Sequence, residues 1–169
     1  EIFFPKIKAA GTEPLSAGDF AYAADVGGVL VQATDTLGLR LLAPAVAAVL
    51  PLARSHQWVL RRVTELPPSR RPESRLCVLG ANSCDGHVSV RLRSSGSLTL
   101  APFAEVLATV LHEGAHFECA GHDARFYKHL GALVSEYFHL CPREDLGARG
   151  LQEAVCDHIK QFDGLWSKP

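Results

Sequence analysis

A short motif, HEGAH at residues 112–116, followed six residues later by His122, constrains this chain more than any other feature. Residues four apart lie on the same face of a helix, so His112 and His116 can point at one metal ion. Glu113 lies at the edge of that face, where it can reach a water on the metal more easily than the metal itself. A third nitrogen has to come from beyond the helix, and the glycine before His122 lets the chain turn back.

This pattern predicts a catalytic zinc site. Three protein ligands leave a fourth position for water, whose pKa falls to about 7. Glu113 would take the proton, orient the hydroxide toward a carbonyl carbon and later protonate the leaving amine. The run before the motif, residues 104–111, is apolar with helical spacing, which predicts that the motif lies on a buried helix.

Several segments of the chain resemble one family of zinc proteases. They are HQWV at 56–59, TELPP at 64–68, CVLGAN at 77–82, VSVRLR at 88–93 and HEGAHFECAGHDARFYKHL at 112–130. Together they resemble the WLM metalloproteases, relatives of the Spartan and SprT-like proteases, and especially the ubiquitin-like-plus-WLM branch. The resemblance covers about residues 42–140. It implies a zinc endopeptidase of DNA–protein crosslink repair, with His112, His116 and His122 as ligands and Glu113 as general base.

The chain departs from the family pattern in two places. Gly114 stands where the family has a large apolar residue, which predicts a catalytic helix destabilised by about 1 kcal/mol. Ala120 and Gly121 replace a bulkier residue or a Gly-Pro pair before the third histidine. The chain also has no methionine, so it lacks the Met-turn of the metzincins, whose histidine spacing it shares.

The 169 residues are enough for one domain with a core, and 47% hydrophobic and 21% charged residues are ordinary for a globular protein. We expect an α+β, zincin-like minimal metalloprotease: a small, mostly antiparallel sheet packed on the HExxH helix and further helices. Residues 1–40 are expected to form an N-terminal extension or the tail of a preceding domain, and residues 41–169 the WLM-like domain. Helices are expected at 42–55, 103–119, 123–139 and 150–163, and strands at 58–63, 76–79 and 88–92.

Two residue roles stay open at this level. The strand at 88–93 is a candidate edge strand that would bind substrate backbone by strand addition, and an internal strand is the alternative. Asp123 is expected to cap the following helix, with a supporting hydrogen bond to His122 as the alternative.

Cysteine content and hydropathy limit the cellular setting. Five cysteines without a CxxC pair argue against a disulfide framework and predict a reducing compartment, nuclear or cytoplasmic. No apolar run approaches a membrane span and no signal peptide is evident, so no membrane partner is expected.

Arginines are concentrated between residues 54 and 93, with eight arginines against three acidic residues, although the net charge is −1. If they share a face they can hold phosphates, and a solvated surface is the alternative. The family resemblance favours DNA contact, and the contacts it would imply are Arg61, Arg62, Arg70, Arg71, Arg91 and Arg93. The expected substrates are proteins on DNA, and ubiquitin- or SUMO-pathway partners would bind through regions outside this chain.

Two other functions remain possible from the sequence. One is a DNA- or ubiquitin/SUMO-pathway interaction module with a structural or inactive zinc site, although a structural site does not need Glu113. The other is a zinc hydrolase that acts on something other than peptides, which the motif alone does not exclude.

Overall fold

The computed structural model describes residues 8–9, 20–66, 79–83, 85–93, 99–140 and 150. Its elements are β1 Lys8–Ala9, β2 Tyr22–Val26, β3 Val29–Ala33, α1 Thr36–Ser55, β4 Arg62–Leu66, β5 Gly80–Ser83, β6 His87–Arg91, α2 Phe103–Ala115 and α3 Ala124–Leu140. Three earlier expectations fall largely outside the described residues. They are the strand at 76–79, the helix at 150–163 and the DNA contacts of Arg70 and Arg71.

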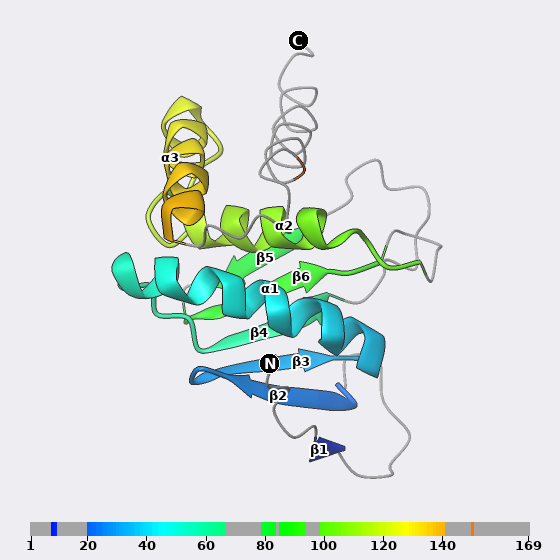
Figure 1. Ribbon diagram of the computed structural model, residues 1–169. Helices are drawn as coiled ribbons and strands as arrows, with labels where there is room; N and C mark the ends of the chain where they lie inside the picture. The colour runs from blue at the N-terminus through cyan, green and yellow to red at the C-terminus, as the bar shows by residue number, and fades with distance from the viewer. Residues whose placement is uncertain are drawn as a thin grey trace.

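The strands form one mixed sheet in the order β1-β2-β3-β4-β6-β5 (Figure 1). The β1–β2, β2–β3 and β5–β6 pairs are antiparallel, whereas β3–β4 and β4–β6 are parallel. Helix α1 packs over β2 and β3, α2 packs over β5 and β6, and α3 packs against both helices. The α+β class predicted from the sequence is confirmed.

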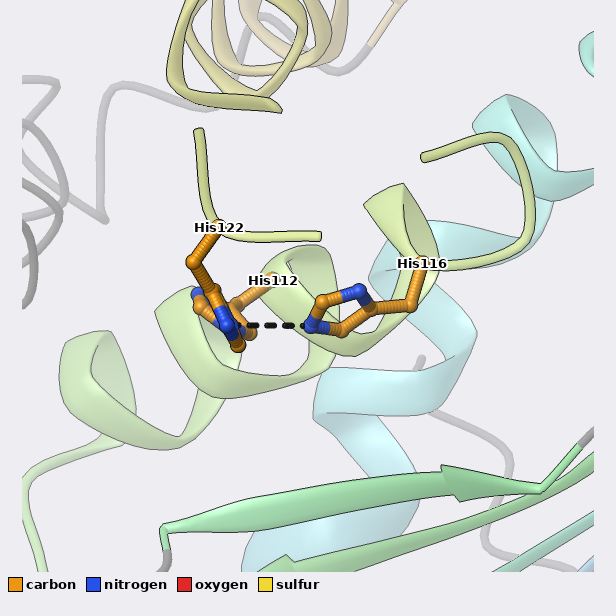
Figure 2. A group of neighbouring side chains, drawn as sticks. All are labelled: His112, His116 and His122. Carbon is orange, nitrogen blue, oxygen red and sulfur yellow. Dashed lines mark hydrogen bonds between the residues drawn. The ribbon is translucent and has the colours of Figure 1, made fainter. Parts of the chain in front are cut away.

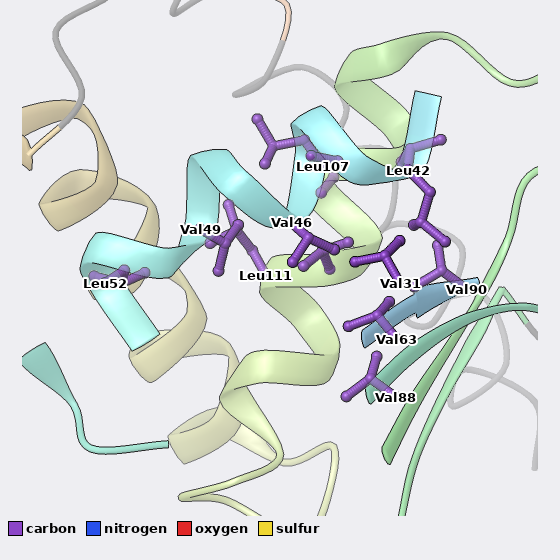
Figure 3. Close-up of a cluster of buried hydrophobic side chains, with 14 of the residues drawn as sticks. Val31, Leu42, Val46, Val49, Leu52, Val63, Val88, Val90, Leu107 and Leu111 are labelled. Carbon is purple, nitrogen blue, oxygen red and sulfur yellow. The ribbon is translucent and has the colours of Figure 1, made fainter. Parts of the chain in front are cut away.

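The core lies between the sheet and the two helices that cover it. Val31, Val63 and Val88 stand side by side on three neighbouring strands, because the registers align Val31 with Val63 and Val63 with Val88. Figure 3 shows them facing α1 and α2, where Val46 and Leu111 are among the buried partners. Burying each such side chain contributes about 1.5–3 kcal/mol, so this packing decides where α2 sits on the sheet.

Helix α1 begins six residues earlier than expected. Asp35 caps it, since its Oδ1 accepts a hydrogen bond of 2.7 Å from Gly38 N. Pro44 lies inside the helix, and the buried apolar face around Leu42 and Val46 outweighs its cost. Contrary to the sequence-based expectation, α1 is long and apolar enough to cross a membrane, and its burial in the core explains that composition.

Residues 20–40 contribute to the same sheet as the expected protease domain. They form β2, β3 and the start of α1, and β3 pairs with β4. The boundary expected after residue 40 lies inside α1. The described part of this segment therefore packs on the same core as the residues that follow it.

Of the two alternatives for the strand at 88–93, an edge strand and an internal strand, the structure shows the internal one. That strand is β6, and it lies between β4 and β5. Among the described strands, β5 forms the edge on the side of α2. Alternating hydrophobicity identifies a strand, but the neighbours of a strand depend on pairing between distant segments.

Two of the six expected DNA-contacting arginines are buried. Arg91 is 8% exposed and Arg93 is 7% exposed. Arg93 forms ion pairs with Glu65 and with Asp35, which join the ends of β6 and β4 to the start of α1. Neither arginine belongs to an exposed basic surface, so the structure removes both from the expected patch. Arg61 remains exposed.

Candidate metal centre

The HEGAH motif lies at the C-terminal end of α2. The helix ends at Ala115, four residues before the expected end, and His116 forms its C-cap with helical dihedral angles (φ −69°, ψ −14°). The spacing of one helical turn between His112 and His116 is therefore preserved. After His116 the chain turns, and Phe117 N donates to Gly114 O over 3.0 Å.

The three histidines of the motif converge. His122 Nε2 lies 2.9 Å from His112 Nε2 and 3.0 Å from His116 Nε2. Figure 2 shows the three rings turned toward one another. One ligand atom from each ring fits within a group 4.8 Å across, so the three could hold a metal ion. Tetrahedral zinc with bonds of about 2.0–2.1 Å separates its ligand atoms by roughly 3.3 Å, close to the two short distances.

A backbone carbonyl orients one of the three rings. His116 Nδ1 lies 2.9 Å from Cys119 O, and a carbonyl can only accept, so the proton is on Nδ1. This tautomer leaves a lone pair on Nε2, the atom that faces His122. Burial lowers the pKa of His116 and of His122, which favours the neutral imidazole that a metal requires.

Phe126 forms an apolar support for the three imidazoles. Its ring centroid lies 4.8 Å from that of His112, 4.6 Å from that of His116 and 4.9 Å from that of His122. Phe126 N donates to Asp123 Oδ1 over 3.0 Å, which confirms that Asp123 caps α3. Phe126 is on the buried face of α3, and no sequence signal indicated its contact with all three histidines.

The side chain of Glu113 lies against the edge strand β5. Its side chain is buried, and burial raises its pKa to about 7. Gly80 of β5 makes room for it, since a Cβ there would lie 2.5 Å from Glu113 Oε1. Asn82 Nδ2 donates to Glu113 O over 2.7 Å. Both β5 residues belong to the CVLGAN segment, but no sequence signal indicated their contact with Glu113.

The space beside Gly114 is filled by another part of the chain. A Cβ at Gly114 would lie 2.5 Å from Cη2 of Trp58, whose indole ring packs against the helix at this point. The ring of Trp58 therefore fills the space that a side chain at position 114 would occupy. A residue with a side chain at position 114 would require Trp58 to move.

Comparisons with known proteins agree with this architecture. The sequence profile of the WLM domain family matches residues 30–160. The chain belongs to the WLM domain family. The match includes all of β3 but its first residue and all of α1, and thus begins earlier than the segments that carried the resemblance.

Solved structures of Wss1 have the same fold. Wss1 from Saccharomyces cerevisiae is 26% identical with a TM-score of 0.53, over 60% of this chain and 77% of that one. A mutant of that protein is 25% identical with a TM-score of 0.52, over 67% of this chain and 82% of that one. Wss1 from S. pombe is 24% identical with a TM-score of 0.52, over 63% of this chain and 88% of that one. At this identity the likeness supports the fold alone. A search of curated protein sequences gave no match. The family match and the shared fold together support placing this chain among the Wss1-like metalloproteases.

Proposed function

We propose that this chain is a zinc-dependent endopeptidase in which His112, His116 and His122 bind zinc and Glu113 is the general base. The observation that carries the proposal is the convergence of three imidazole nitrogens within a group 4.8 Å across. The donor chemistry fits zinc, because neutral imidazole is a common zinc ligand and the Nδ1 bond of His116 directs its Nε2 inward.

Glu113 carries out the proton transfers of the proposed reaction. Zinc bound by three histidines supplies Lewis-acid activation of a water molecule and of the scissile carbonyl. A carboxylate oxygen of Glu113 takes the proton of the attacking water while the C–O bond forms. The same oxygen then delivers the proton to the leaving amine nitrogen as the C–N bond breaks.

We propose that β5 aligns the substrate. Among the described strands it forms the edge of the sheet beside α2, and its Gly80 contacts the side chain of Glu113. An extended peptide that pairs with β5 would gain backbone hydrogen bonds and lie next to the base. This assignment replaces the strand at 88–93, which lies inside the sheet.

We further propose that the substrates are proteins bound or crosslinked to DNA, in the nucleus or the cytoplasm. Family membership and the exposed Arg61 support this substrate class. Arg62 is half-buried and donates to Gln32 Oε1 over 2.7 Å, so Arg61 is the better candidate for a phosphate contact. Ubiquitin- or SUMO-pathway partners, expected to bind outside this chain, stay a prediction.

The test compares the wild type with Glu113→Gln, which keeps the shape of the side chain but cannot accept the proton. Bound zinc is measured in both, and then cleavage of a DNA-binding protein with and without single-stranded DNA. Zinc in both proteins, with turnover only in the wild type and only with DNA, supports the proposal. Equal DNA-independent turnover in both overturns it. Bound zinc without turnover on any protein favours an interaction module.

A further inference from the structure

Trp58 packs against the segment of α2 that joins the proposed base to a proposed ligand. Its Cη2 lies 2.5 Å from the position that a Cβ on Gly114 would occupy, and Gly114 lies between Glu113 and His116. A glycine is therefore needed at position 114 for the indole ring to approach the helix backbone this closely.

The same indole ring contacts the chain on the other side of His116. Its Nε1 donates to Glu118 Oε1 over 2.7 Å. The ring also stacks on Phe117, with centroids 5.8 Å apart and planes at 22°. Phe117 and Glu118 begin the turn that leads to His122, so Trp58 holds residues both before and after the second ligand.

The carboxylate of Glu118 is anchored by more than the indole. His56 Nδ1 lies 2.9 Å from its Oε1, and His129 Nε2 lies 3.3 Å from its Oε2. His56 Nε2 in turn lies 2.8 Å from Glu136 Oε2 on α3. The turn that carries the third histidine is thus tied to the end of α1 and to α3.

We propose that Trp58 is a positioning residue for the metal centre, acting through Gly114 on α2 and through Glu118 on the turn before His122. Glu118 lies next to Cys119, whose carbonyl orients the ring of His116. Loss of the indole would release both segments and allow the three nitrogens to separate. The inference rests on the proposed zinc site and assigns to it a residue that is distant from it in the sequence.

The test measures zinc affinity, by competition with a chromophoric chelator, and the visible spectrum of the cobalt-substituted protein, which reports ligand geometry. Trp58→Ala should weaken zinc binding about 10- to 100-fold and change the cobalt spectrum. Trp58→Phe keeps an aromatic ring beside Gly114 but loses the N–H donor, so a smaller loss is expected. Val59→Ala is the matched control, since the neighbouring Val59 side chain is 56% exposed.

Glu118 and Gly114 allow two further comparisons. Glu118→Ala should weaken zinc binding, whereas Glu118→Gln keeps an oxygen that accepts from the indole and should recover most of the affinity. Gly114→Leu should weaken binding in the wild type, where it collides with Trp58, but improve it in the Trp58→Ala background, where the space is open.

The outcomes separate this inference from the proposed function. Wild-type protein that binds no zinc overturns both. Zinc binding by the wild type, with unchanged affinity and cobalt spectra in folded Trp58→Phe and Glu118→Ala, overturns the positioning role alone. An equal loss in Val59→Ala also overturns it. Circular dichroism checks that each variant is folded. If Trp58→Ala is unfolded, the test uses Trp58→Phe instead.

Discussion

A single methyl group added at Gly80 should disable the proposed base and leave the rest of the protein intact. A Cβ at this position would lie 2.5 Å from Oε1, 2.8 Å from Cδ and 2.8 Å from Cγ of Glu113. Carbon atoms in ordinary contact are about 3.5–4.0 Å apart, so the carboxylate of Glu113 has to move by about 1 Å. Asn82 holds the backbone of Glu113, so the side chain moves and the helix stays.

A displacement of this size should lower the catalytic rate strongly and the stability of the fold only slightly. Misplacing a reacting group by about 1 Å costs about 100-fold in rate, equivalent to about 2.7 kcal/mol in the activation free energy. We therefore expect Gly80→Ala to lower kcat/KM on a protein substrate about 100-fold. Zinc content should not change, and the midpoint of thermal unfolding should change by a few degrees at most.

The assay compares Gly80→Ala with Gly131→Ala, which adds the same methyl group where no atom lies within 4 Å. Gly131→Ala should keep wild-type kcat/KM and should be slightly more stable, because alanine favours the helix. A Gly80→Ala enzyme with wild-type kcat/KM would refute the reasoning, since Glu113 would then not need this space. Loss of zinc together with activity would show that Gly80 acts through the ligands instead.

Three other variants test different parts of the structure. Partial burial lowers the pKa of His56, but its contacts with Glu136 and Glu118 outweigh this and raise the pKa above its ordinary value. Stability from these contacts is fully present below about pH 6.5 and is lost as the pH rises through the raised pKa. His56→Gln should therefore reduce the free energy of unfolding more at about pH 6 than at about pH 9 in urea titrations. The control is His139→Gln on the exposed side of α3. Equal losses for His56→Gln at both pH values would contradict the prediction. Glu65→Ala leaves Arg93 without its buried partner, although Asp35 remains, and should cost about 2–4 kcal/mol in urea unfolding; a cost below about 1 kcal/mol would contradict the ion pair. Phe126→Ala should cost about 3–5 kcal/mol and weaken zinc binding, because the ring supports all three histidines; unchanged zinc affinity would exclude that support.

Local sequence patterns predicted a helix well where residues within or next to that helix determine its position. The apolar period before His112 predicted α2, and the acidic residue at 123 predicted the start of α3. The bounds of a helix were predicted wrongly where contacts with distant parts of the chain determine them. The start of α1 was placed too late because Pro44 weighs against a helix locally, whereas its buried face stabilises it in the fold.

The sequence by itself determined the chemistry of the candidate site, because the spacing of His112 and His116 is a property of any helix and His122 follows after a short turn. Only the tertiary structure decided what surrounds these residues. Pairing between distant strands placed β5, and not β6, at the edge beside Glu113, and packing brought Trp58 into the space beside Gly114. It also buried Arg93 between two carboxylates. These contacts join residues far apart in the chain, so no local periodicity or motif predicts them.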